Sequence, residues 1–251
     1  MGVTVLFAFI IGLMIGSFLN VCIYRLPNGQ SIINPRSHCA HCRTVLGVRD
    51  LIPLLSYVLL KGRCRYCNKT FSLRYAFVEL FTGVIFGLCL FLMGPSFLLI
   101  KPLTSASFFI VIAFIDYDHQ LILDKILIWF AGIGVIINLF VGNITIIDMA
   151  IASLLGGGIL LLIAILTKGG MGGGDIKFVA ALGLWLGLKL TLLTIFLSFV
   201  IGGIGSLLLL AFRIKGRKDF IPFGPFIAIA AFISMLYGQE IIYRYLQTMV
   251  K

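Results

Sequence analysis

Two aspartates stand out in a chain that has few acidic residues. The 251-residue sequence holds nine Asp and Glu residues; Asp116 follows the apolar run "FFIVIAFI", and Asp175 ends the glycine-rich segment "GGMGGGD". Two carboxylates about 4 Å apart repel by roughly 4 kcal/mol at an effective dielectric near 20, so one of them keeps a proton. The ionised partner can draw a proton from an attacking water while the protonated one hydrogen-bonds to the oxyanion that develops on a peptide carbonyl. The pair is therefore suited to peptide hydrolysis.

Three glycines, Gly172, Gly173 and Gly174, come directly before Asp175. Without a Cβ they permit positive φ angles and let an extended substrate backbone approach closely, so we expect a loop that presents the acid to a peptide. The alternative is an ordinary membrane turn beside an interfacial acid. A carboxylate inside the bilayer costs about 2.5 to 3.5 kcal/mol on insertion scales, which favours the functional interpretation.

Asp118, Asp124 and Glu79 are further candidates for substrate contacts. On a helix, Asp116 and Asp118 point about 200° apart, so they do not face the same partner. Glu79, in "RYAFVEL", is either a buried polar contact or part of a substrate groove.

Four cysteines have the spacing of a metal site. Two CxxC pairs are separated by 21 residues, close to the spacing of a zinc ribbon, in which each pair contributes two thiolates to a tetrahedral site. The segment around them, residues 25–74, is too short to form a good core, and a structural zinc can contribute on the order of 10 kcal/mol to folding. The predicted zinc ligands are Cys39, Cys42, Cys64 and Cys67.

Disulfides are the alternative role for these cysteines, which a reducing compartment disfavours. His38 and His41 flank the first pair and could replace a cysteine, but a complete set of four thiols favours solvated histidines. Cys22 and Cys89 lie in apolar runs, where we expect small buried hydrophobic residues.

Composition places all these residues in or beside a membrane. The chain is 61% hydrophobic and 12% charged, outside the range of soluble domains. The first apolar run, residues 3–24, has no charge and would extend about 33 Å as a helix, enough to cross the hydrocarbon. A cleaved signal peptide is disfavoured because no basic segment precedes the run.

Further apolar runs follow, and one of them, residues 178–212, would be about 52 Å long as a single helix. Because this length exceeds a bilayer, we divide the run near Gly187 to Lys189. The sequence therefore predicts an all-α polytopic membrane protein with about eight transmembrane helices and a small cytoplasmic zinc-ribbon-like loop domain after the first helix. The other runs cover residues 75–93, 95–115, 126–143, 146–167 and 221–243.

Lys and Arg gather on the cytoplasmic side of membrane proteins. With the N-terminus outside, the inner segments hold 16 of the 20 basic residues, including nine in residues 25–74 and four in residues 213–218. Two helices separate Asp116 from Asp175, so both return to this face. The net charge of +11 thus reflects topology. No aromatic residues interleave with the basic ones as on a nucleic-acid surface, so we expect no nucleic-acid partner.

These motifs resemble those of the type IV prepilin peptidases over nearly the whole chain. In that family the first aspartate of "IDxD" and the aspartate of "GxGD" form the catalytic pair, which the resemblance carries onto Asp116 and Asp175. Two departures, Leu123 and Ala40, stand where many relatives have proline and do not touch this pair. The matching segments are "GSFLNVCIYRLP" (16–27), "RSHCAHC" (36–42), "DLIPLLSY" (50–57), "GRCRYC" (62–67), "RYAFVEL" (74–80), "IDYDHQLILD" (115–124), "GMGGGD" (170–175) and "PFGPF" (222–226).

The resemblance implies an enzyme of the bacterial cytoplasmic (inner) membrane that cleaves the basic leader of prepilins and pseudopilins after a glycine, on the cytoplasmic side. It also implies N-methylation of the new amino terminus with S-adenosylmethionine, an activity associated with the N-terminal portion that bears the cysteines. Peptidase activity alone is the alternative. Asp118, Asp124 and Glu79 would attract the basic residues of the leader.

Taken together, the sequence divides into a first transmembrane helix (residues 1–24), a cytoplasmic four-cysteine loop (25–74) and a multi-helix peptidase domain in the lipid bilayer (75–251). Two rival functions are weighed against this interpretation. A proton- or cation-coupled transporter also places acids in broken helices, but the sequence shows no internal repeat between its halves. A non-catalytic assembly factor would use the cysteine loop to bind a partner and would tolerate loss of either aspartate.

Overall fold

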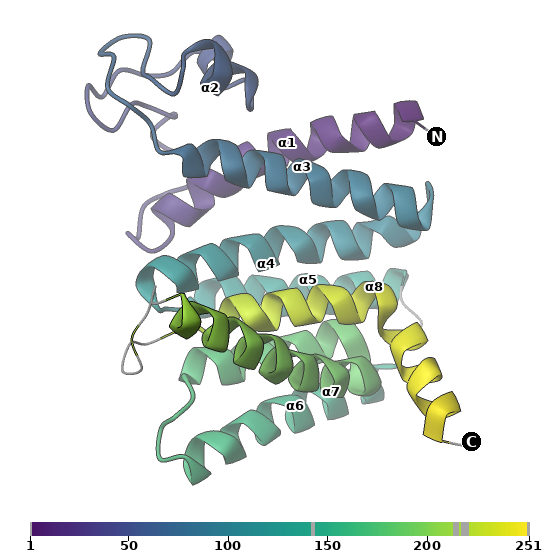
Figure 1. Ribbon diagram of the computed structural model, residues 1–251. Coiled ribbons are helices and arrows are strands. Elements are labelled where there is room, and N and C mark those ends of the chain that lie inside the picture. The colour runs from purple at the N-terminus through teal and green to yellow at the C-terminus, as the bar shows by residue number, and fades with distance from the viewer. Residues whose placement is uncertain (1, 142–143, 213–215, 217–220, 250–251) are drawn as a thin grey trace. The chain divides into compact units, whose positions relative to one another are not determined.

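The computed structural model describes residues 2–141, 144–212, 216 and 221–249. Within these residues the regular structure is helical and no strand is formed, apart from two isolated bridges in the cysteine loop. This confirms the predicted all-α class. In chain order the elements are α1 (Gly2–Arg25), η1 (Val48–Asp50), α2 (Leu55–Leu59), α3 (Leu73–Met93), η2 (Phe97–Leu99), α4 (Ile100–His119), α5 (Asp124–Phe140), α6 (Ile146–Leu166), α7 (Gly173–Ala211) and α8 (Gly224–Met249) (Figure 1).

The chain forms two compact units, residues 1–111 (unit 1) and residues 112–251 (unit 2), with the boundary inside α4. Unit 1 contains α1, the cysteine loop and α3. Unit 2 contains the C-terminal part of α4 and helices α5 to α8. Both aspartates of the predicted pair belong to unit 2, and all four predicted metal ligands belong to unit 1.

Among the described residues, six helices are long and apolar enough to cross a membrane: α1, α3, α4 with η2, α6, α7 and α8. The two other predicted crossings come from α5, which has 17 residues, and from α7, which has 39 residues and a non-helical residue at Gly187 (φ 71°, ψ 175°). The predicted division of the 178–212 run near Gly187 is thus confirmed. The basic residues predicted at 213–218 lie outside the described part of the chain.

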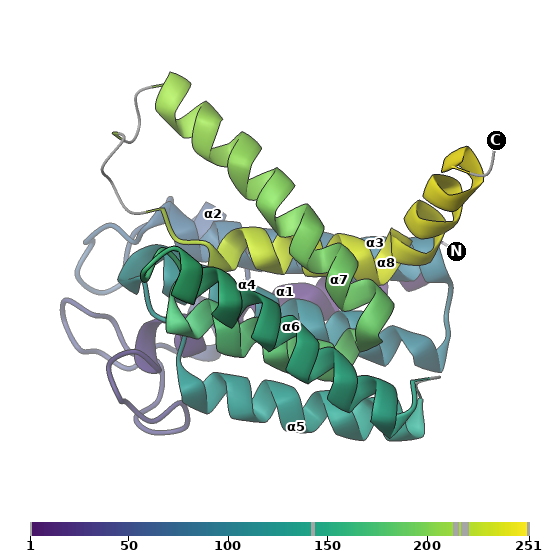
Figure 2. The same ribbon diagram turned by 90° about the horizontal axis from the view of Figure 1, so that it is seen from below.

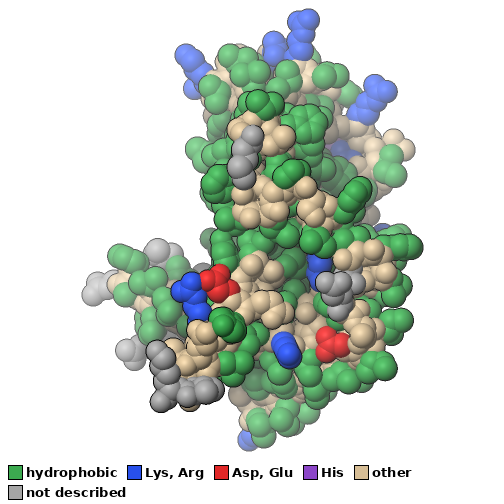
Figure 3. Space-filling model, turned by 90° about the vertical axis from the view of Figure 1, so that its right-hand side faces the viewer, with side chains coloured by type: hydrophobic (Ala, Val, Ile, Leu, Met, Phe, Trp, Pro, Cys, Tyr) green, Lys and Arg blue, Asp and Glu red, His purple; other side chains and the backbone are tan. Residues whose placement is uncertain are grey.

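The membrane helices expose large hydrophobic side chains (Figure 3). Phe7 of α1, Leu154 of α6 and Phe196 of α7 are 66%, 75% and 64% exposed. Water would solvate such surfaces poorly, whereas lipid acyl chains cover them without cost. The exposed side chains therefore fit the predicted multi-pass membrane protein.

Unit 1 is held together by close packing of α1 against α3. A Cβ atom at Gly12 would lie 2.7 Å from the Cα of Gly83, and one at Gly16 would lie 2.8 Å from the Cα of Glu79. Small residues at such positions let two membrane helices approach closely, which strengthens their dispersion contacts in a solvent that supplies no hydrophobic driving force. The glycines of α1 thus allow close packing of the two helices, α1 and α3, between which the cysteine loop runs.

Unit 2 is organised around α7, which packs against α5, α6 and α8 and bends sharply at Gly187 (Figure 2). The break frees backbone groups that a bilayer cannot solvate. Asn138 of α5 donates to the carbonyl oxygens of Leu184 (2.7 Å) and Trp185 (3.2 Å). The N–H of Leu188 donates to the carboxylate of Asp148 at 3.3 to 3.4 Å. Two side chains from neighbouring helices therefore provide hydrogen bonds to the backbone groups that the break leaves without helical partners.

Candidate active site

Asp116 and Asp175 come together inside unit 2. Asp116 lies in the last turn of α4 and Asp175 in the first turn of α7. Their residues are only 5% and 7% exposed, and the charge of Asp116 acts on the Asp175 carboxyl group. The structure thus places the two acids of the predicted pair within electrostatic reach of each other, although they lie 59 positions apart in the sequence.

Asp175 is not in the loop that the sequence predicted, because α7 begins at Gly173. Gly173 and Gly174 are therefore helical, and Gly172 is the residue that caps the helix. Asp175 occupies the third helical position, and its carboxylate accepts a hydrogen bond from the backbone of Gly172. An acidic side chain at this position accepts a hydrogen bond from an N–H group that has no partner within the helix, and its negative charge interacts favourably with the positive end of the helix dipole. The apolar run of residues 178–212, from which the helix was predicted, covers only the later part of α7 and not its first turn.

Asp116 also lies against the beginning of a helix. The N–H of Gly224, the first residue of α8, donates to Oδ2 of Asp116 at 2.9 Å. A Cβ atom at position 224 would lie 2.7 Å from the same oxygen, so only glycine allows this contact without displacement. Gly224 is part of the "PFGPF" motif (222–226), for which the sequence predicted no role. Its signal was a glycine that lies two residues after Pro222 and directly before Pro225, at the start of an apolar run.

The glycines before Asp175 differ in what surrounds them. A Cβ at Gly172 would lie 3.0 Å from Oδ2 of Asp175, and a Cβ at Gly174 would lie 2.9 Å from the Cβ of Ile122. Nothing lies within 4 Å of a Cβ built at Gly173. Gly174 therefore lets α7 begin close to the segment that follows α4, while Gly172 leaves room for the carboxylate. Gly173 faces open space, where a substrate has access.

The four cysteines gather into one cluster in unit 1. Their Sγ atoms lie within 4.8 Å of one another, and those of Cys39 and Cys67 are 3.9 Å apart. All six cysteines of the chain are free thiols, so the disulfide alternative is not formed. The cluster is compatible with a bound metal ion, as predicted. His38 and His41 are exposed, and Cys22 and Cys89 are buried, as the sequence indicated.

The two CxxC pairs form equivalent turns. In each pair the first cysteine donates its N–H to the carbonyl five residues later, Thr44 for Cys39 and Lys69 for Cys64. An isolated antiparallel bridge closes each turn, His38 with Val45 and Arg63 with Thr70. Hydrogen bonds from Thr44 lower the pKa of the Cys42 thiol to about 6, whereas the pKa of Cys67 rises to about 11, because a backbone hydrogen bond from Lys69 is outweighed by burial and the neighbouring thiols. A thiolate is the form that binds a metal ion.

Comparisons with known proteins identify the family of this chain. The family model described as Bacterial Peptidase A24 N-terminal domain matches residues 10–93, and the Type IV leader peptidase family matches residues 103–207. A prepilin leader peptidase/N-methyltransferase from Bacillus subtilis (strain 168) is 37% identical, over 95% of this chain and 96% of the relative. Proteins of the same name from Aeromonas salmonicida (strain A449) and Neisseria gonorrhoeae are 34% and 33% identical, over 96% and 90% of this chain and 94% and 88% of the relatives. No solved structure matches the chain.

The chain belongs to the type IV leader peptidase family. This confirms the resemblance seen in the sequence motifs. In this leader peptidase, Gly224 lies beyond residues 103–207 that the family model matches, yet it contacts Asp116 directly. The surroundings of the pair are therefore incomplete without α8.

The remaining candidate residues of this leader peptidase have other surroundings. Asp118 is exposed, on the side of α4 opposite the buried Asp116. Asp124 is exposed and forms an ion pair with Lys177 at 2.8 Å. Glu79 belongs to unit 1, where it is half-buried and accepts hydrogen bonds from the N–H of Leu54 (2.9 Å) and from Ser17. Of the two interpretations of Glu79, the structure shows the polar contact.

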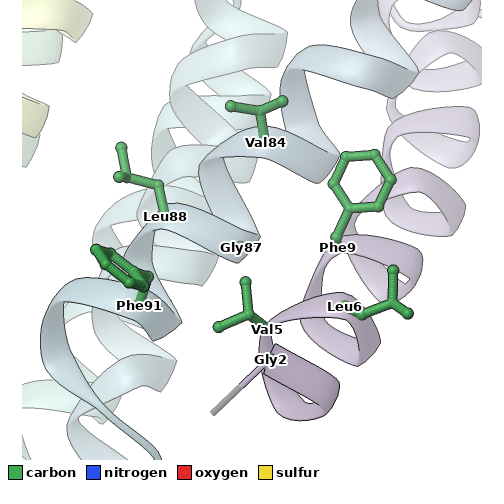
Figure 4. Close-up of a pocket in the computed structure, with 8 residues that line it drawn as sticks. All are labelled: Gly2, Val5, Leu6, Phe9, Val84, Gly87, Leu88 and Phe91. Carbon is green, nitrogen blue, oxygen red and sulfur yellow. The ribbon is translucent and has the colours of Figure 1, made fainter.

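An apolar groove of about 460 Å³ lies between α1 and α3 (Figure 4). Its lining side chains, which include Val5, Phe9 and Leu88, carry no titratable or hydrogen-bonding group. In a bilayer such a groove suits an acyl chain. It provides no polar contacts for a charged methyl donor, so the residues there do not fit S-adenosylmethionine.

Proposed function

We propose that this protein is an aspartic endopeptidase that removes the basic leader of prepilins and pseudopilins. Cleavage would follow the glycine that ends the leader, on the cytoplasmic side of the bacterial inner membrane, and the new amino terminus would then be methylated. Membership of the type IV leader peptidase family supports the peptidase, and relatives named prepilin leader peptidase/N-methyltransferase support both activities. The observation that carries the proposal is the buried, interacting pair of Asp116 and Asp175.

We propose Asp116 as the ionised member of the pair, although Asp175 likewise accepts a backbone hydrogen bond at a helix start. The Gly224 N–H at 2.9 Å and the positive end of α8 both favour a carboxylate at that position. Repulsion between the two acids then leaves the proton on Asp175. Asp116 would take a proton from water as the water oxygen attacks the scissile carbonyl. Asp175 would hydrogen-bond to the oxygen on which negative charge develops.

The surroundings of the pair suit a peptide that is basic at one end and apolar at the other. Both acids lie in terminal turns of membrane-spanning helices, which is where a polar leader meets an apolar helix. The open space beside Gly173 permits approach of a substrate backbone. We further propose that exposed Asp118 and Asp124 attract the leader, whose lysines would compete with Lys177 for Asp124.

We propose zinc as the metal of the four-cysteine cluster. A tetrahedral ion with Zn–S bonds of about 2.3 Å holds its sulfurs about 3.8 Å apart, and Sγ of Cys39 lies 3.9 Å from that of Cys67. Four thiolates close the coordination sphere, so the ion would be structural. When bound, zinc would supply folding free energy to residues 25–74, which contain few regular elements.

The names of the relatives imply a methyl donor, and we propose that this donor is S-adenosylmethionine. Its binding residues are not assigned, because the apolar groove of unit 1 does not fit it.

Incubation of the purified protein with a synthetic prepilin, with and without S-adenosylmethionine, tests both activities. Mass spectrometry of the product should show a cut after the leader glycine, and a mass increase of one methyl group only with the donor. Asp116→Asn and Asp175→Asn should each stop cleavage while the protein stays folded. An assembly factor would instead tolerate both changes and lose function with any of the four clustered cysteines.

A further inference from the structure

The cysteine loop carries an apolar segment that the metal cluster does not explain. Residues 51–60, here called the apolar arm, connect the two CxxC pairs and include α2. Large hydrophobic side chains of the arm are exposed, Val58 and Leu59 by 68% and 71%. None of them belongs to a membrane-spanning helix. The exposed members are Leu51, Ile52, Leu55, Val58 and Leu59.

A hydrogen bond fixes the depth of the apolar arm. The N–H of Leu54 donates to Oε2 of Glu79 at 2.9 Å. Glu79 is six residues beyond Leu73, the first residue of α3, which is about 9 Å along the helix axis. Figure 1 accordingly shows α2 level with the first turns of α3. The arm therefore lies beside a membrane-spanning helix rather than beyond its end.

The apolar arm has a defined conformation. The N–H of Gly62 donates to the carbonyl of Tyr57 at 2.8 Å, and that of Arg63 donates to the carbonyl of Leu60 at 3.0 Å. A Cβ at Gly62, which has a φ of +66°, would lie 2.8 Å from Oη of Tyr57. The arm is thus joined tightly to the second CxxC pair, and its exposed side chains form a fixed surface.

Cations flank the apolar arm on both sides. Arg49 precedes it, and Lys61 and Arg63 follow it, all exposed. Residues 25–74 contain nine Lys and Arg residues and one acid, Asp50, which is paired with Arg65. An apolar surface bordered by cations fits the interface of a bilayer that contains anionic lipids.

We propose that the apolar arm inserts among the acyl chains at the membrane surface, with Arg49, Lys61 and Arg63 against anionic phospholipid headgroups. The arm then holds the four-cysteine cluster at the membrane. A protein partner is the competing occupant of this surface, and the following experiment separates the two.

The photo-crosslinking residue p-benzoylphenylalanine is introduced at Val58 of the full chain, which is reconstituted into nanodiscs with equal amounts of phosphatidylglycerol and phosphatidylcholine. Matched variants carry it at Phe7, an exposed residue of α1, and at Val45, 54% exposed on the first CxxC turn. After irradiation, mass spectrometry should find lipid adducts at positions 58 and 7, at least five-fold above position 45. The proposal is overturned if position 58 yields no more than position 45, or if it cross-links to protein or to an added prepilin peptide.

The charge part of the proposal has its own readout in the same nanodiscs. Adducts at position 58 should be enriched at least two-fold in phosphatidylglycerol. The double variant Lys61→Gln, Arg63→Gln should return this ratio to that of the bulk lipid, whereas Arg36→Gln, Arg43→Gln on the first CxxC turn should keep the enrichment. Equal ratios in all three proteins would overturn the assignment of Lys61 and Arg63 to lipid headgroups.

Discussion

Helix α7 meets an aspartate at its first turn and another at its break, and the two places differ in what surrounds the acid. At the first turn, Asp175 accepts from the backbone of Gly172 and interacts with a second carboxyl group, that of Asp116. At the break beside Gly187, Asp148 accepts the N–H of Leu188. Both acids thus accept hydrogen bonds from backbone groups where a helical segment of α7 begins, but only for Asp175 does the described part of the chain show an acidic neighbour.

This difference separates the catalytic use that we propose for the pair from a structural use of the same local motif. A carboxylate at a helix N-terminus accepts hydrogen bonds from N–H groups without helical partners and interacts favourably with the helix dipole. These two effects are sufficient to explain the presence of Asp148 at the break. A pair of carboxyls costs stability through mutual repulsion and needs another explanation, which acid–base chemistry supplies. Four predictions on unit 2 test this distinction, and a fifth concerns a structural acid of the cysteine loop.

The largest effect is expected from neutralising one acid of the pair. Asp116→Asn and Asp175→Asn should each lower the rate of prepilin cleavage by about 10²- to 10⁴-fold, because each removes one member of the acid–base pair. The measurement is single-turnover cleavage by protein whose folded fraction is known from its thermal transition. Asp148→Asn is the matched control and should retain cleavage per folded molecule. Loss of cleavage in that control, or an unchanged cleavage rate in either variant of the pair, would contradict the comparison.

The glycines that touch the pair should come next. The added methyl groups of Gly224→Ala and Gly172→Ala would displace the carboxylates of Asp116 and Asp175, respectively. A displacement of about 1 Å in a catalytic group can lower the rate by up to about 10²-fold. We expect kcat to fall by about 10- to 100-fold with little change in KM. Gly203→Ala, where a Cβ meets nothing within 4 Å, controls for the substitution itself.

Gly173→Ala tests whether the open space at this glycine serves the substrate and not the catalytic pair. Its Cβ meets no protein atom within 4 Å, so the pair should keep its geometry and kcat should stay close to that of the unchanged protein. A raised KM would show that the substrate backbone passes Gly173. A fall in kcat equal to that of Gly172→Ala would instead contradict the assignment of distinct roles to these glycines.

At the break of α7, substitutions should lower stability rather than catalysis. Asn138→Leu leaves the carbonyl of Leu184 without its donor, which costs about 1 to 3 kcal/mol. Gly187→Ala places a side chain on a residue whose φ is +71°, and its Cβ would lie against the carboxylate of Asp148. We expect this change to cost about 1 to 2 kcal/mol or more of folding free energy. Unfolding in detergent measures both, with Gly132→Ala, in open space on α5, as the control. A loss of cleavage per folded molecule would place the break in the catalytic machinery.

The smallest effect is expected in the cysteine loop. A hydrogen bond from Arg65 holds the pKa of Asp50 below its ordinary value. Since the folded pKa is lowered, the stabilisation is complete above about pH 5 and is lost as the pH falls through the folded pKa. Asp50→Asn should therefore cost less than about 1 kcal/mol, by an equal amount at pH 6 and pH 8. Thermal unfolding at the two pH values measures this, and a difference that grows between them would contradict it.

Local sequence determined much of this protein. Runs of apolar residues predicted the membrane helices, since a helix must be about 20 residues long and apolar to cross a bilayer. The length limit also placed the break near Gly187, which the structure confirms. The repeated CxxC spacing predicted one cluster of four thiols, because each pair forms a turn whose two sulfurs point the same way. Such features depend on neighbours in sequence.

Other features were decided by the tertiary structure. The first turn of α7 was mistaken for a loop because its glycines carry no apolar signal, whereas the helix there is stabilised by capping through Asp175. Gly224 gained its role because α8 brings a backbone N–H to Asp116, 108 positions away. Glu79 could not be interpreted until the structure placed the N–H of Leu54 against it. These contacts join distant parts of the chain, and they form only where packing of whole helices sets the distance between them.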